Sequence, residues 1–152
     1  MVPDHRRLPH DLRPSTVDVV RRLMLGVLLL GMTGLLVELT LLAHYEDAQQ
    51  LIPLALLGSG IVGVILDLIV SRRWTRMIVQ AVMALLIVAG LLGVYLHYQG
   101  SREFQLEMDA TMSGMDLLWH VLRAKSPPTL APGSMVQLGL LGLGYMYLRR
   151  VI

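Results

Sequence analysis

The chain alternates long apolar stretches with shorter polar segments. Four nearly uninterrupted apolar runs cover residues 23–43, 51–70, 77–98 and 130–148. A helix of about 20 apolar residues is long enough to cross the hydrocarbon core of a bilayer, which is ~30 Å thick. The runs are continuous and lack the alternation of a membrane-spanning β-strand. The pattern therefore predicts an all-α integral membrane protein with four transmembrane helices.

The composition agrees with this class. Of the 152 residues, 55% are hydrophobic and 16% are charged, whereas a typical soluble domain carries about 25% charged residues. We interpret residues 23–152 as one membrane domain, preceded by a polar cytoplasmic tail at residues 1–22. The sequence has no cysteine, which excludes disulfides, thiolate metal sites and thiol catalysis.

The basic residues are distributed unevenly between the two sides of the predicted bundle. Ten of the 13 lie in the tail, in the loop at residues 71–76 or after residue 148, and only Arg102, Arg123 and Lys125 lie in the other connections. Lysine and arginine are retained on the cytoplasmic side of a membrane. We therefore predict that both termini are cytoplasmic. The pI near 9.3 does not indicate nucleic-acid binding, because the basic residues flank the apolar runs.

The long connection between the third and fourth runs has an amphipathic pattern. Over residues 103–123, large apolar residues recur at helical spacing and fall on one stripe. The stripe consists of Phe104, Met108, Met112, Met115, Trp119 and Leu122. Gly114 weakens the middle, so the segment forms one outer-surface helix or two short ones. Two interpretations stay open: the stripe lies on the outer leaflet or caps the bundle, or it docks another protein.

Two carboxylic acids interrupt the apolar runs, and ionisable groups at such positions are functional candidates. We expect Glu38 about 7–8 Å from the midplane toward the outside, and Asp67 roughly 10 Å toward the cytoplasm. This separation excludes a catalytic dyad. Glu38 is expected to be protonated or hydrogen-bonded to Gln137, at the same depth. Asp67 is expected to pair with Gln80, at the same depth, or with Arg72 and Arg73.

The sequence shows no catalytic constellation. The outer connections carry histidines and carboxylates, but none of them follows a tight zinc-binding motif. The glycines fall inside the apolar runs, where small residues let helices approach closely. We therefore predict no enzymatic activity, no metal site and no cofactor.

Two stretches resemble a group of small, uncharacterised bacterial membrane proteins with four helices. They are His-Tyr-Glu-Asp at 44–47 with Gln-Leu-Ile-Pro-Leu at 50–54, and Leu-Ala-Pro-Gly at 130–133 with Gln-Leu-Gly-Leu-Leu-Gly-Leu-Gly-Tyr at 137–145. The resemblance covers most of the chain and implies a bacterial inner-membrane location, with no known activity. Glu38 is also similar to the membrane glutamate of small multidrug-resistance exporters. Its outward position and the long outer connection depart from that family.

Two functional hypotheses follow. The first is a non-catalytic accessory or assembly subunit of a larger bacterial inner-membrane complex. It would bind other membrane-protein subunits, or a second copy of itself, through a glycine-rich helix face and the segment 103–123. The alternative is a small homo-oligomeric, proton-coupled transporter or channel that uses Glu38.

Overall fold

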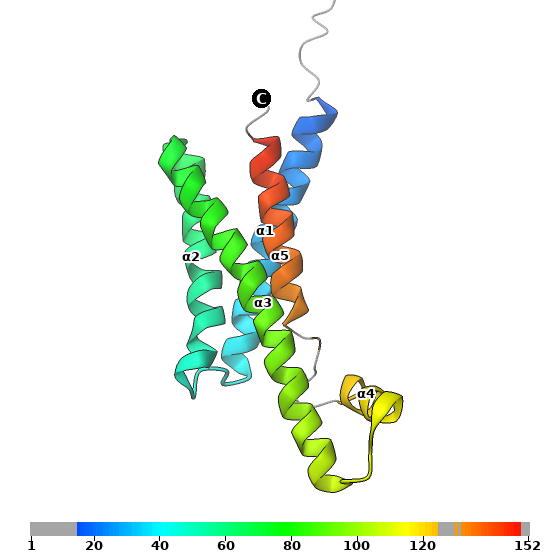
Figure 1. Cartoon of the computed structure of the whole chain (residues 1–152). Coiled ribbons are helices and arrows are strands. Elements are labelled where there is room, and N and C mark those ends of the chain that lie inside the picture. The colour runs from blue at the N-terminus through cyan, green and yellow to red at the C-terminus, as the bar shows by residue number, and fades with distance from the viewer. Residues whose placement is uncertain (1–14, 125–129, 131, 150–152) are drawn as a thin grey trace, which may run out of the picture.

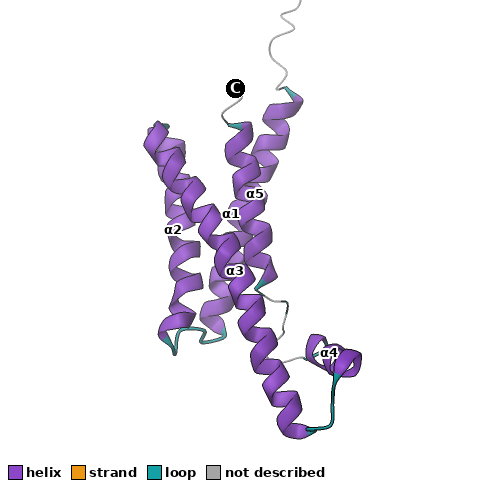
Figure 2. Cartoon of the chain, in the orientation of Figure 1, coloured by secondary structure: helices purple, strands orange, loops and turns teal. Residues whose placement is uncertain are grey.

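The structure is a computed structural model in which residues 15–124, 130 and 132–149 are described. Most of the predicted tail, residues 125–129 of the outer connection and Arg150 lie outside these described residues. Within them the chain is helical, with loops and no strand (Figure 2). The helices are α1 (Thr16–Leu41), α2 (Ala48–Val70), α3 (Arg73–Met108), α4 (Gly114–Leu122) and α5 (Gly133–Leu148).

The four longer helices form an antiparallel bundle that α3 crosses diagonally. Near its start α3 lies beside α2, and in its middle it packs on α5, which in turn contacts α1 (Figure 1). The start of α1, the turn between α2 and α3 and the end of α5 lie at one end of the bundle. The α1–α2 loop lies at the other end, where α3 continues past it and carries α4.

Helices α1, α2 and α3 are long and apolar enough to cross a membrane by length and composition. The all-helical prediction is confirmed, and these helices are compatible with a multi-pass membrane protein. In the described residues α5 has 16 residues, which makes it about 24 Å long. That is shorter than the predicted run at 130–148, so the fourth crossing stays a prediction.

Glycines bring the backbones of α3 and α5 together. A Cβ atom on Gly139 would lie 2.6 Å from the carbonyl oxygen of Met83, and one on Gly90 would lie 2.9 Å from that of Pro132. Lipid tails compete equally well for leucine side chains, so helices in a membrane associate mainly through such close backbone contacts. Gly139 and Gly90 therefore set the distance between α3 and α5.

The segment predicted as one outer helix or two short ones, at 103–123, is divided between two helices. Residues up to Met108 continue α3, which is 36 residues long, and α4 follows after a break. The break is a turn in which the side chain of Asp109 accepts hydrogen bonds from the backbone N–H and hydroxyl of Thr111, at 2.9 and 2.6 Å. Both bonds lower the pKa of Asp109, and the bond from the Thr111 hydroxyl has the larger effect. Gly114 supplies a left-handed backbone, with φ of 59°, which only glycine adopts without strain.

The glycine contacts give a first prediction. Gly139→Ala should lower the stability of the bundle by about 1–3 kcal/mol, because the new methyl group forces α3 and α5 apart. Gly58→Ala is the matched control, since nothing lies within 4 Å of a Cβ atom there. Thermal unfolding in mild detergent, followed by circular dichroism, compares the two. Equal melting temperatures would contradict this account of the α3–α5 contact.

Candidate functional site

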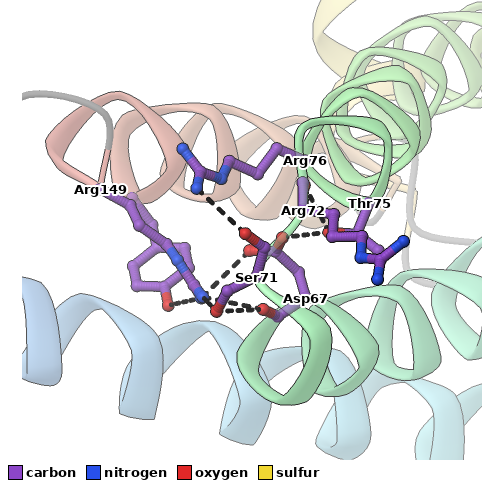
Figure 3. Close-up of polar contacts among 7 residues, drawn as sticks. Asp67, Ser71, Arg72, Thr75, Arg76 and Arg149 are labelled. Carbon is purple, nitrogen blue, oxygen red and sulfur yellow. Dashed lines mark hydrogen bonds and ion pairs between the residues drawn. The ribbon is translucent and has the colours of Figure 1, made fainter.

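The most buried ionisable group of the described residues is Asp67, in the last turn of α2. The residue is 1% exposed. The hydroxyl of Thr75 lies 2.5 Å from its Oδ1, and Nη1 of Arg149 lies 3.0 Å from its Oδ2 (Figure 3). Three helices therefore meet at this carboxylate, since Thr75 belongs to α3 and Arg149 follows α5.

A tight turn positions Thr75 against Asp67. Helix α2 ends at Val70, the left-handed backbone of the next residue, Ser71 (φ 51°), reverses the chain, and α3 begins at Arg73. The backbone N–H of Ser71 donates to the carbonyl of Asp67 at 3.0 Å. Thr75 also lies 2.7 Å from the carbonyl of Arg72. A hydroxyl has one proton, so it donates to either that carbonyl or Asp67, not to both.

Arg149 links the end of α5 to the end of α2. Its Nη2 donates to the backbone carbonyl of Asp67 and to Oγ of Ser71, both at 2.8 Å. Its Nη1 also donates to the Tyr145 hydroxyl at 3.2 Å. The last carbonyls of a helix lack partners within the helix and carry its negative end. A guanidinium is therefore well matched to this position.

We call Asp67, Ser71, Thr75 and Arg149 the polar clamp. All four side chains contact one another or the backbone, and Oδ2 of Asp67 makes an ion pair with Arg149 but no hydrogen bond with any described residue. The arrangement fastens the ends of α2, α3 and α5 together. Among the described parts of the chain, no three histidine, cysteine or acidic side chains are grouped to hold a metal ion.

The cation beside Asp67 differs from the expected one. We expected Arg72 or Arg73, and both are exposed, whereas the structure places Arg149 there. The expected pairing with Gln80, which is half-buried further along α3, stays a prediction. The local sequence could suggest Thr75, eight residues after Asp67 across a turn. No local pattern indicates Arg149 as a partner, because it lies 82 residues away and its position after an apolar run predicts only topology.

Glu38 and Gln137 do not meet. Both residues are exposed, and neither side chain has a hydrogen bond or ion pair within the described residues. The register of α1 and α5 explains this. Gly31 faces Leu138, and Gly144 faces Met24, so Gln137 lies level with the residues near Gly31. Glu38 lies two turns further along α1, at the start of α5, and does not line the interior of the bundle.

The predicted outer stripe is mostly exposed. Phe104 and Met108 lie on the extension of α3, Met112 is half-buried in the break, and the rest lie on α4. Large exposed side chains of the stripe include Phe104 at 59%, Met108 at 73%, Met115 at 68% and Trp119 at 54%, with Leu122 at 36%.

A different pair of residues anchors α4. Leu117 and Val121 are buried, α4 packs on α3, and Ser101 of α3 is buried as well. The stripe is therefore mostly apolar surface left open by the fold, with the guanidinium of Arg123 lying over the Trp119 ring, 5.1 Å from its centroid. Sequence reasoning missed Leu117 and Val121, because the more regular stripe lies on the other side of the same helix.

The polar clamp gives a second prediction. Arg149→Gln should lower the free energy of unfolding by about 3–5 kcal/mol, because it leaves a buried carboxylate without its cation. Arg73→Gln, at an exposed position, is the matched control and should have little effect. Adding Asp67→Asn to Arg149→Gln should recover part of the loss. A double-mutant cycle by unfolding in detergent measures this coupling, and strictly additive effects would argue against the clamp.

Comparisons with known proteins leave the function open. The sequence matches no protein-family model, no curated protein and no solved structure. The resemblance to small bacterial four-helix membrane proteins therefore stays a prediction, and a function has to be inferred from the residues of this chain and their arrangement.

Proposed function

We propose that the chain crosses the bacterial inner membrane four times, with α5 as the fourth span and both termini in the cytoplasm. The arginines support this orientation, since Arg22, Arg73 and Arg149 lie near the end of the bundle where α1 begins and α5 ends. The acidic pair Glu46 and Asp47 lies in the loop at the opposite end. A short α5 is compatible with a crossing, because bilayers thin locally around short helices at modest cost.

The absence of cysteine allows a direct test of this orientation. Ala110→Cys and Arg73→Cys place single thiols at exposed positions at opposite ends. In intact spheroplasts a membrane-impermeant maleimide should label the thiol at position 110, and the thiol at position 73 only after permeabilisation. The reverse pattern would invert the topology, and labelling of both thiols in sealed cells would rule out an odd number of crossings between them.

Within that membrane we propose a non-catalytic accessory or assembly subunit of a larger complex. The observation that carries the proposal is the exposed stripe, and above all Met108, Met115 and Trp119. Exposed clusters of large apolar side chains outside the spans mark surfaces that bind protein or membrane. The anchoring pair Leu117 and Val121 already fixes α4 to α3, so the stripe is free to contact a partner.

The charges near the stripe favour a protein over a lipid surface. Four acidic residues are exposed on the extension of α3, in the break and on α4, against two exposed arginines. The acids are Glu103, Glu107, Asp109 and Asp116, and the arginines are Arg102 and Arg123. Helices that bind anionic lipid carry basic polar faces, so an acidic surface is poorly suited to that role. Methionines are adaptable and common at protein-binding surfaces. The partner surface would be apolar with basic residues around it.

Catalysis and transport through one copy have less support. The clamp uses Asp67 for internal contacts, and Glu38 lies on the outer surface of α1. We therefore do not propose proton-coupled transport through a single bundle.

The stripe gives a further prediction. Extraction of the wild-type protein from its native membrane in mild detergent should yield a particle with other subunits. The double variant Met115→Ala with Trp119→Ala should shift the protein to a smaller particle, because truncating buried interface aromatics removes much of the binding energy. Tyr45→Ala is the matched control, since Tyr45 is 50% exposed at the same end of the bundle. Native mass measurement distinguishes the outcomes, and an unchanged particle in the double variant would contradict the proposal.

A further inference from the structure

The outer face of α1 carries two polar groups that the fold leaves unsatisfied. Thr33 and Glu38 are both exposed, and neither side chain has a hydrogen-bond partner among the described residues. By contrast the hydroxyl of Thr40, nearby on the same helix, donates to the Leu36 carbonyl at 2.7 Å. In hydrocarbon a polar group without a partner is costly, and a carboxyl group most of all. We therefore expect another helix to contact this face and to supply hydrogen-bond donors and acceptors for the two groups.

The apolar residues of the same face are spaced for contact with another helix. They recur every three or four positions, as the a and d residues of a heptad do. These residues are Leu23, Val27, Leu30, Gly34, Val37 and Leu41. Gly34 lies within this series, and nothing lies within 4 Å of a Cβ atom placed on it. A second helix therefore has room to approach closely at that position.

The heptad positions of the polar groups indicate what covers them. With Gly34 at position a, Thr33 is at position g and Glu38 is at the following position e. In a parallel pair of helices, each g residue faces the following e residue of the partner. Thr33 of one copy would then face Glu38 of the other, and the symmetry of the pair would form this contact twice.

We propose that two copies of the chain associate in parallel along this face of α1, with Thr33 of each copy donating a hydrogen bond to Glu38 of the other. The contact satisfies all four side chains with residues of this chain alone. It is independent of the partner proposed for the outer stripe, because it lies within the span and on another helix.

The exposed face of α2 over residues 51–70 differs from that of α1 in having no polar side chain without a partner among the described residues. It has similar apolar spacing, but its polar residue Ser59 already donates to the Leu56 carbonyl at 3.0 Å. No polar group there requires a second copy. The face of α2 therefore provides matched controls for each test on α1.

Cross-linking of single cysteines in the cysteine-free protein tests the pairing. Leu30→Cys on α1 and Ile69→Cys on α2 occupy positions of nearly equal exposure, 76% and 74%. In vesicles of purified protein, oxidation should link two copies through position 30 and not through position 69. Equal yields at the two positions, or none at position 30, would overturn the proposal. So would a link at position 30 formed in native membranes to a different protein and absent from the vesicles.

Variants on the two faces separate the polar contact from folding. Glu38→Leu and Thr33→Val should each weaken dimerisation roughly tenfold, whereas Glu38→Gln should retain it, because an amide also accepts from the threonine. Gly34→Leu should block the approach, and Gly58→Leu on α2, also at an open site, should not. Helicity and membrane insertion are measured for every variant. Dimerisation that survives Glu38→Leu in a folded, inserted protein would overturn the assigned contact.

Separate measurements distinguish a failure of the dimer proposal from a failure of the accessory-subunit proposal. The dimer is measured with purified protein in vesicles, whereas the accessory role is measured by the mass of the native particle. Loss of the dimer with the large particle intact removes the pairing alone. A dimer without other subunits removes the accessory role alone.

Discussion

The close approach of α3 and α5 is the contact on which the rest of the bundle depends. At Gly139 and Gly90 the backbone of one helix lies against the backbone of the other, with no room for a methyl group. Met83 fills the adjoining space, and its side chain also contacts Gly142. This distance determines how far α5 lies from α3 along its whole length, and therefore where Arg149 emerges at the end of α5.

The polar clamp follows from that placement. Arg149 can bind Asp67 and Ser71 only because α5 ends beside the α2–α3 turn. The pair also shows how a membrane bundle tolerates a buried carboxylate. A cation neutralises it, a hydroxyl approaches its other oxygen, and both partners come from helices that the carboxylate itself helps to hold. An isolated acid at the same depth would be far more costly.

Sequence reasoning predicted the features that depend on local pattern. The apolar run at 51–70 nearly coincides with α2. The length and composition of the runs at 23–43 and 77–98 likewise identified α1 and α3. The end of α3 was misplaced, because residues 99–102 are polar enough to separate the apolar run from the predicted helical segment at 103–123, whereas α3 continues through them to Met108. The pairing of Asp67 with Arg149 and the failure of Glu38 to reach Gln137 both depend on the register of α5, which long-range glycine contacts determine. No local pattern contains that register, and helix depth counted from the ends of a run was too coarse to supply it.

The polar groups of the spans divide into two classes by where the bundle places them. Asp67 and Thr75 face inward, where the Thr75 hydroxyl lies beside one carboxylate oxygen and Arg149 forms an ion pair with the other. Thr33 and Glu38 face outward, and their side chains have no hydrogen-bond partner among the described residues. The large apolar residues of the stripe on α3 and α4 also face outward. Here the interior is closed by glycines, methionines and the clamp, and the unsatisfied chemistry lies on the outer surfaces. Such a distribution supports the proposal that the protein acts by contacting other proteins, through one surface on α1 and another at the end of α3 and on α4.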